Sequence, residues 1–254
     1  MRVVQLSDCH LVSDPDLLFK GVNPAQHLQE ALSHIARLQP SADLLVLTGD
    51  LAHDERVETY RWLKAQLNQT SIPFCLVPGN HDSPTLMDDE FGPQGGNPYG
   101  GFVIHRNGWS FLGLSTHRPN REEGYLGERQ LSWCQSHLQA LGETPTLVFM
   151  HHPPVAVGSP WIDRIGLHDS AAFAQCLIGA PQVKGIFCGH VHQPFAGLIG
   201  QTPVYTTPST AVQFRPNTDV PQLTEERPAY RIIDLGKDAM QTETRSWCET
   251  SPVS

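Results

Sequence analysis

Long apolar runs and paired cysteines are scarce in this sequence. No apolar stretch approaches the ~20 residues of a membrane-spanning helix, and the opening residues MRVVQLSDCH lack the apolar core of a secretion signal. The 6 cysteines include no C-x-x-C pair and are spread over apolar segments, so we expect reduced thiols rather than a disulfide framework. These absences predict a cytoplasmic protein that is not associated with a membrane.

Basic residues are also few. The 17 Lys and Arg residues are outnumbered by 26 Asp and Glu residues, which gives a formal net charge of −9. Such a chain repels the phosphate backbone, so we do not expect a nucleic-acid partner. Repeats, low-complexity blocks and linkers are missing too, and 39% of the 254 residues are hydrophobic. We therefore expect residues 1–254 to form a single α/β domain with a large core.

The first third of the chain alternates between strand and helix patterns. Apolar runs at 2–7, 42–49 and 74–78 predict buried strands. Asn23 and Pro24 predict a helix start, and this helix should run to about Gln39. A second helix is expected over 55–69, because apolar residues recur on one face. This order predicts a parallel sheet.

The rest of the chain adds antiparallel elements. Segment 101–115 predicts a hairpin that turns at Asn107-Gly108, and 195–207 predicts another. Residues 213–228 hold three prolines and are expected to form a surface loop near the site. We expect two packed mixed sheets covered by helices. The remaining expected elements are helices near 127–141 and 169–178 and strands at 146–150, 183–187 and 229–235.

Five expected strands end in side chains that bind metals or transfer protons. Any one of these stretches could be a turn, a helix cap or a structural histidine. Their joint occurrence favours a shared site, because the carboxyl ends of strands in α/β sheets are where ligands bind. The five stretches are Asp8-Cys9-His10, Gly49-Asp50, Gly79-Asn80-His81-Asp82, His151-His152-Pro153 and Gly189-His190-Val191-His192.

These motifs, D-x-H, G-D, G-N-H-D, H-x-P and G-H-x-H, resemble in order those of the calcineurin-like metallophosphoesterases, over residues 8–192. Segments 151–167, 206–214 and 228–235 further resemble the class III cyclic-nucleotide phosphodiesterases, the group of bacterial 3′,5′-cyclic-AMP phosphodiesterases. The resemblance implies a four-layer α/β/β/α sandwich. It also implies a hydrolase that converts 3′,5′-cyclic AMP into the 5′-nucleotide, with other cyclic nucleotides as further candidate substrates.

The resemblance also implies two metal ions that share Asp50, at a separation of ~3.5–4 Å. The implied ligands are Asp8, His10, Asp50 and His192 at the first ion, and Asp50, Asn80, His151 and His190 at the second. Oxygen and nitrogen donors without a thiolate favour Fe or Mn, with Zn or Co as alternatives. The implied substrate-binding residues are His10, Asp50, Asn80, His81 and His192.

The charge of this site suits a small-molecule phosphodiester. Two divalent ions outweigh two carboxylates and a bridging hydroxide, and Asn80 is neutral, so the centre stays positive and attracts a monoanion. The ions would bring the pKa of the bridging water toward ~7 and supply a hydroxide for attack on phosphorus. They would also offset the charge that grows in the transition state.

Two residues of the third stretch are candidate catalytic residues. His81 would protonate the departing alkoxide oxygen. Asp82 would hold the His81 ring or, equally well, cap a helix in SPTLMDDEF. For His53 the sequence favours a solvated histidine at a helix start over one that reaches substrate. For His152 it leaves open whether the ring orients the neighbouring ligand, lines the pocket or packs in a loop.

Other functions remain as alternatives. The same site could act on glycerophosphodiesters, nucleotide-sugar diesters or aryl diesters, and the pocket walls would decide between them. A scaffold without catalysis is disfavoured, because all seven ligands and His81 are present. The sequence does not decide between a monomer and a homodimer.

Overall fold

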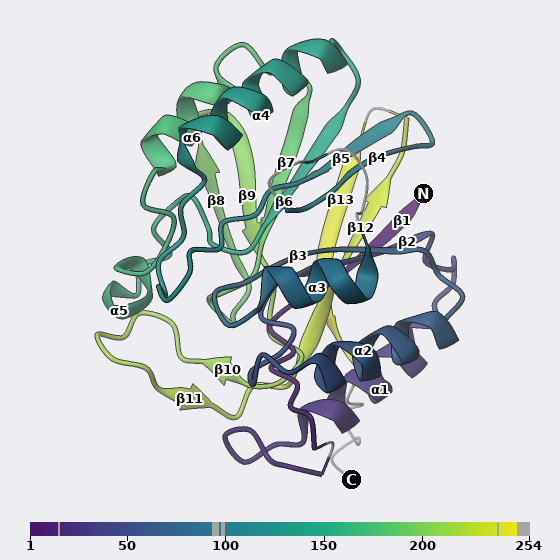
Figure 1. The fold of residues 1–254 in the computed structure, drawn as a ribbon. Coiled ribbons are helices and arrows are strands. Elements are labelled where there is room, and N and C mark those ends of the chain that lie inside the picture. Colours follow the sequence, from purple (N-terminus) through teal and green to yellow (C-terminus); the bar gives the residue numbers. More distant parts are fainter. Residues whose placement is uncertain (15, 93–96, 98–99, 238, 248–254) are drawn as a thin grey trace, which may run out of the picture.

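The computed structural model describes residues 1–14, 16–92, 97, 100–237 and 239–247. Its strands form two mixed sheets, as Figure 1 shows. Helices flank both sheets, so the expected four-layer arrangement is confirmed. Among the described residues, no helix is both long and apolar enough to cross a membrane.

The first sheet contains both ends of the described chain. Its strand order is β13-β12-β1-β2-β3. The strands β1 (Arg2–Leu6), β2 (Leu44–Thr48) and β3 (Phe74–Val77) run parallel. The strands β12 (Ala229–Leu235) and β13 (Met240–Ser246) are added antiparallel. The three parallel strands therefore share one carboxyl edge, where the first three candidate stretches begin.

The second sheet supplies the other two stretches. Its strand order is β4-β5-β6-β7-β9-β8, and β5, β6, β7 and β9 run parallel. The two expected hairpins are confirmed as β4–β5 and β8–β9. The bounds are β4 (Val103–Arg106), β5 (Trp109–Gly113), β6 (Thr146–Met150), β7 (Val183–Cys188), β8 (Phe195–Ile199) and β9 (Thr202–Thr206).

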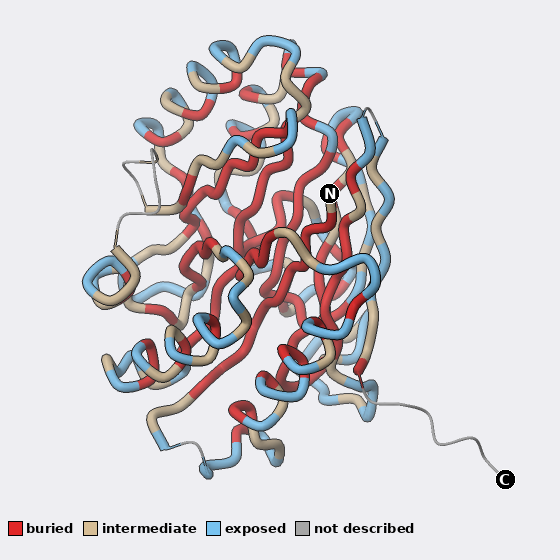
Figure 2. The backbone as a smooth tube through the Cα atoms, turned by 90° about the vertical axis from the view of Figure 1, so that its right-hand side faces the viewer, coloured by how far each residue is buried: buried red, intermediate tan, exposed pale blue. Residues whose placement is uncertain are grey.

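Three apolar clusters hold the layers together. The central one lies between the sheets, where the rings of Phe149 and Phe187 stack with centroids 5.4 Å apart. The second packs helices α1 and α2 on the first sheet, and the third packs α4 and α6 on the second. Figure 2 shows the resulting buried interior. The helices are α1 (Pro24–Ile35), α2 (Val57–Gln69), α3 (Pro84–Phe91), α4 (Gly127–Leu141), α5 (Pro160–Asp163) and α6 (Ser170–Leu177).

For helix α1, local sequence signals predicted the first residue of the helix correctly but not the last. Asn23 Oδ1 accepts a hydrogen bond from Gln26 N at 2.8 Å, so the expected cap is confirmed. The helix ends at Ile35 instead of continuing to Gln39. Beyond Ile35 the backbone bonds from Arg37 and Leu38 span three residues, so the last turn tightens and the chain leaves the helix.

The expectation of a loop over residues 213–228 is partly wrong. It contains two short antiparallel strands, β10 (Gln213–Phe214) and β11 (Leu223–Thr224). Arg215 N donates to Gln222 O at 2.7 Å and continues their pairing. The prolines lie outside these two strands, where they remove no donor from the ladder. Residues 213–224 therefore form a ribbon rather than an irregular loop.

Candidate metal centre

The structure brings all seven candidate ligands to the edge between the two sheets. The segments after β1, β2 and β3 carry Asp8, His10, Asp50 and Asn80, and those after β6 and β7 carry His151, His190 and His192. All except Asn80, which is half-buried, are buried. A site of this kind needs both sheets, because neither one alone provides the full set.

Asp50 lies between two groups of ligands. Its Oδ1 is 3.4 Å from His151 Nε2, and its Oδ2 is 3.8 Å from His10 Nε2. His151 Nε2 is also 3.2 Å from Asn80 Oδ1. The two oxygens of one carboxylate thus face histidines on opposite sheets, which is the arrangement that a bridging ligand requires.

The first group surrounds His192. Its Nδ1 donates to Val212 O at 2.7 Å, which leaves Nε2 to face the other ligands. That atom lies 3.0 Å from His10 Nε2 and 3.3 Å from Asp8 Oδ1. Two imidazole nitrogens this close need a proton or a cation between them. Asp8 then supplies the negative charge that a cation favours.

At this site, two further imidazole nitrogens are buried and have no hydrogen-bond partner among the described residues. They are His10 Nδ1 and His190 Nε2. Burial lowers the pKa of both histidines well below the usual value, so their rings are neutral. For His190, the unpartnered Nε2 is the atom that a metal would use.

Asp50 and His151 form a coupled pair in the metal-free protein. Burial alone would lower the pKa of His151, but the charge and hydrogen bond of Asp50 outweigh it and raise this pKa to about 9. The same pairing holds the pKa of Asp50 well below its usual value despite burial. His151 Nδ1 donates its proton to Thr48 O at 2.7 Å. When the imidazolium loses a proton, it therefore does so at Nε2, whose lone pair then faces Asp50 and Asn80.

These residues fit a divalent metal. Asp8, His10 and His192 present ligand atoms within 4.8 Å of one another, and so do Asp8, Asp50 and His151. Ligand–metal bonds of about 2.0–2.2 Å place neighbouring ligand atoms within such a distance. The donors are carboxylate oxygens and imidazole nitrogens, which suit transition metals.

His152 is close to this centre but is not free to bind a metal. Its Nδ1 lies 2.7 Å from Thr116 Oγ1, and its Nε2 lies 2.9 Å from Glu122 O. Burial lowers the pKa of His152 to about 3, so the ring is neutral and both nitrogens are engaged. His152 is therefore a packed histidine. It connects the segment after β5 to the candidate ligands His151 and His190, whose rings it contacts.

The backbone is strained where the ligands sit. Asp8, His10, Asp50, His190 and His192 have φ between 46° and 71°, the left-handed region that non-glycine residues rarely adopt. Each such residue costs of order 1–3 kcal/mol and persists only where the surrounding structure enforces it. Five candidate ligands in this conformation indicate a functional constraint at the strand ends.

Two glycines allow the strand ends to approach closely. A methyl group on Gly79 would overlap the Asp50 carboxylate, and one on Gly189 would overlap Ser7 Oγ. The G-N-H-D and G-H-x-H motifs therefore begin with glycine because another backbone or side chain passes directly over that position.

Asp82 has partners other than the two expected from the sequence. Its carboxylate accepts hydrogen bonds from the backbone N–H groups of Leu51, Ala52 and Gly79 and from the Tyr60 hydroxyl. The N-cap of α3 is Ser83. The expectation that Asp82 caps this helix is therefore wrong, and its carboxylate binds the backbone beside Asp50 and Asn80 instead of the His81 ring.

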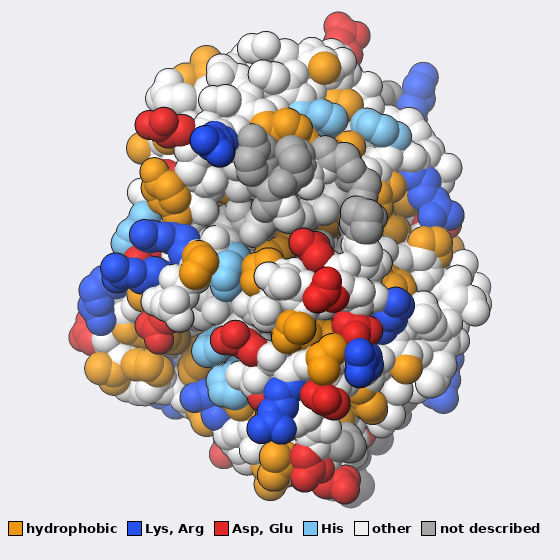
Figure 3. All heavy atoms as spheres, viewed as in Figure 1, with side chains coloured by type: hydrophobic (Ala, Val, Ile, Leu, Met, Phe, Trp, Pro, Cys, Tyr) orange, Lys and Arg blue, Asp and Glu red, His pale blue; other side chains and the backbone are white. Residues whose placement is uncertain are grey.

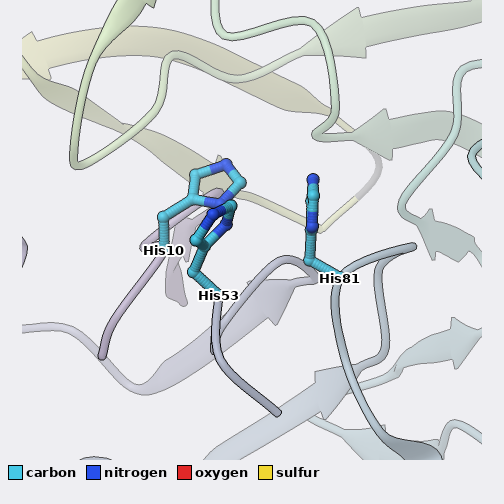
Figure 4. A group of neighbouring side chains, drawn as sticks. All are labelled: His10, His53 and His81. Carbon is cyan, nitrogen blue, oxygen red and sulfur yellow. The ribbon is translucent and has the colours of Figure 1, made fainter. Parts of the chain in front are cut away.

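His81 and His53 stand beside the first group. The rings of His10, His53 and His81 gather at the ends of the first sheet, as Figure 4 shows, with centroids 4.8–5.4 Å apart. His53 is exposed and does not begin a helix, since α2 starts at Val57. His81 N donates to Asp50 Oδ1 at 2.9 Å, which places the His81 backbone against the bridging candidate.

A cavity of about 500 Å³ opens onto these residues. Beyond the candidate ligands it is lined by side chains that sequence reasoning did not select, because they come from segments distant in sequence and carry no motif. They include Phe19, Lys20, Trp161, Arg164, Ile165 and Phe214. Figure 3 shows acidic and basic side chains interspersed on one face of the molecule.

Comparison with known proteins gives a consistent result. The family model for calcineurin-like phosphoesterases matches residues 1–194. A 3′,5′-cyclic-nucleotide phosphodiesterase of Nostoc sp. is 32% identical over 242 residues, which cover 95% of this chain and 90% of the relative. The 3′,5′-cyclic adenosine monophosphate phosphodiesterase CpdA of Pseudomonas aeruginosa is 31% identical over 236 residues, covering 93% and 86%.

The fold is also similar to that of solved structures. A dimetal phosphatase from Danio rerio superimposes with a TM-score of 0.75 at 16% identity, over 98% of this chain and 96% of that protein. At this identity the likeness concerns the fold alone, and it agrees with the two-sheet arrangement described above.

Proposed function

The chain belongs to the calcineurin-like phosphoesterase family, and from that premise we propose that it hydrolyses 3′,5′-cyclic AMP to the 5′-nucleotide at a two-metal centre. The relatives named above are cyclic-nucleotide phosphodiesterases, and they align along nearly the whole chain. The observation that carries the proposal is the position of Asp50, whose two oxygens face His151 and His10 on different sheets.

The proposed ligands divide around Asp50. Asp8, His10 and His192 hold the first ion together with Asp50, and Asn80, His151 and His190 hold the second with it. Fe and Mn are the favoured ions, since the donors are imidazoles and oxygens. When bound, the two ions supply a hydroxide near neutral pH and neutralise phosphate oxygens.

His81 is the proposed general acid. It belongs to neither of the two ligand groups proposed around Asp50, although its ligand atom, with those of His10 and His53, also lies close enough to share an ion. Its half-buried side chain lines the cavity. From there it can donate a proton to the alkoxide oxygen that leaves when the ring phosphate opens. The hydrogen bond from His81 N to Asp50 Oδ1 holds the backbone of this proposed acid beside the bridging carboxylate.

Asp82 is proposed as a positioning residue. Its bonds to Leu51 and Ala52 hold the segment after Asp50, and its bond to Gly79 holds the segment before Asn80. A carboxylate in this place fixes the orientation of two ligands without touching the substrate.

The deciding experiment measures metal content and turnover on the same purified protein. We expect two ions per chain and higher kcat/KM for cyclic AMP than for cyclic GMP or bis-p-nitrophenyl phosphate. Two bound ions with fast aryl-diester turnover and no cyclic-nucleotide turnover would favour a broad-specificity or glycerophosphodiester enzyme instead. Two bound ions without turnover of any diester would indicate a scaffold.

A further inference from the structure

One wall of the cavity is apolar and lies beyond the candidate ligands. Trp161 and Ile165 come from α5 and the residues after it, and Phe214 and Pro221 come from the β10–β11 ribbon. Trp161, Ile165 and Phe214 are half-buried, so each has a surface left to contact a ligand. We name these four residues the aromatic wall.

The aromatic wall is built as a unit. The rings of Trp161 and Phe214 meet edge to face, with centroids 5.0 Å apart and planes at 77°. The two segments are joined by a hydrogen bond of 2.9 Å from Asn217 N to the buried Ser159 Oγ. Phe214 also contacts the ring of His192 at 4.7 Å. The wall therefore continues directly from a proposed metal ligand.

Two cations lie beside the wall, although the chain is acidic overall. Lys20 Nζ is 5.9 Å from the centroid of Phe214, and Arg164 lines the same cavity, where Glu122 is the acidic lining residue besides Asp50. Both are exposed. Cations beside an aromatic surface attract an anion toward the centre and also favour electron-rich rings.

The cavity has a metal end and an aromatic end, and this division favours a phosphodiester that carries a planar group. A phosphate held at the metal end places the rest of the diester against the wall. A glycerol group offers hydroxyls, for which Ile165 and Phe214 have no polar atom and Trp161 has only its buried indole nitrogen. A planar base offers a π-face, and aromatic side chains bind such faces by stacking.

We propose that the aromatic wall is a nucleobase subsite, with Trp161 as its main stacking residue. This inference rests on the proposed function and extends it to the base. The indole nitrogen of Trp161 is buried and has no hydrogen-bond partner among the described residues. No hydrogen bond to a described residue therefore fixes the ring, and the half-buried side chain has surface left for a base to stack on.

The test compares the binding of two ribose 5′-phosphates, one with a base and one without. Isothermal titration of the metal-loaded protein with 5′-AMP and with ribose 5-phosphate gives the ratio of their Kd values. In the wild type we expect AMP to bind at least about tenfold more tightly, because stacking contributes on the order of ten- to a hundredfold. Trp161→Ala should bring the ratio close to one, and Trp161→Phe should restore part of it.

Trp133→Ala is the matched control, because Trp133 stacks on His137 in α4 and does not line the cavity. It should keep the wild-type ratio. A wild-type ratio near one, or a ratio that Trp161→Ala leaves unchanged in a folded protein, would overturn the subsite. Failure of the proposed function is a separate result: AMP would bind with the expected ratio while cyclic AMP is not hydrolysed.

Discussion

The hydroxyl of Tyr60 donates a hydrogen bond to Asp82 Oδ1 at 3.1 Å, and both side chains are buried beside the candidate metal centre. Burial and the charge of Asp50 raise the pKa of Asp82, while the backbone N–H groups that it accepts from lower it. Tyr60 Oη in turn accepts from Ser83 N at 2.8 Å. Helix α2 is thereby connected to the backbone that carries Asp50 and Asn80.

Asp82→Asn tests this connection. The amide cannot accept all the bonds that the carboxylate accepts, so the variant should lose about 1–3 kcal/mol of unfolding free energy. Metal affinity should fall by about 10- to 100-fold, because two ligand segments lose their support. Urea unfolding and metal titration measure these effects, and Tyr60→Phe should show a smaller loss. Unchanged metal affinity with a reduced kcat would restore the idea that Asp82 acts on His81.

Asp50→Ala should remove both metals, since Asp50 faces both ligand groups. His190→Ala, which removes one ligand of the second group, should leave one metal in place and more residual activity. Elemental analysis of the purified variants gives the stoichiometry, with Asp88→Ala on the exposed face of α3 as an acidic control. An Asp50→Ala variant with two metals and near-normal turnover would show that Asp50 does not bridge.

His81→Ala should keep both metals and lose on the order of 10²–10⁴ in kcat on cyclic AMP, whose ribose alkoxide leaves poorly without a proton. The loss should be much smaller on bis-p-nitrophenyl phosphate, because p-nitrophenolate leaves as a stable anion. The measurement is kcat/KM on both substrates together with metal content.

Two outcomes would contradict the acid role of His81. Equal losses on the two substrates would indicate that His81 holds the phosphate rather than protonating the leaving group. Loss of one metal would make His81 a ligand, in keeping with its position beside His10 and His53.

Shortening the β10–β11 ribbon should change substrate discrimination. Replacing residues 216–221 by Asn-Gly keeps the pairing of Arg215 with Gln222 and supplies a two-residue turn. Pro221 is removed from the cavity, so kcat/KM should fall more for cyclic AMP than for bis-p-nitrophenyl phosphate. Equal losses on both substrates with a lower Tm would make the ribbon only structural.

The metal-free protein should lose stability in mild acid. Burial lowers the pKa of His152 to about 3, below the value of about 6.5 in the unfolded chain. Its contribution is therefore complete above about pH 6.5 and is lost as the pH falls toward about 3. From pH 6.5 to 5 the loss is about 2 kcal/mol for this group. Tm measured across this range should fall, and less so in His152→Gln; equal slopes would contradict the assignment.

The sequence was sufficient to predict both an element and its site residue where a local hydrophobic pattern is followed directly by a chemical motif. The apolar run at 146–150 forms β6 with those bounds, and His151 follows it at the site. It was insufficient for β13, whose residues alternate in exposure along the edge of the first sheet and form no apolar run. The conformation of this strand depends on pairing with β12, which is a tertiary effect.

The same distinction applies to the site. The D-x-H, G-D and G-H-x-H motifs predicted which residues meet, because parallel strands share one carboxyl edge. They did not predict that Trp161 and Phe214 meet at 5.0 Å, since this contact joins segments about 50 residues apart through the packing of α5 on the ribbon. They also did not predict the partners of Asp82, which depend on where α2 places Tyr60.

The division of ligands between the sheets has a consequence for the whole molecule. The first sheet contributes Asp8, His10, Asp50 and Asn80, and the second contributes His151, His190 and His192, so ions held as proposed would cross-link the two halves. The described cysteines are all free and provide no covalent link. An ion present at a hundred times its Kd adds about 2.7 kcal/mol to folding stability. The cohesion of the sandwich would then rise and fall with the free metal available to the cell, so that metal starvation would first loosen the protein and thereby expose it to proteolysis.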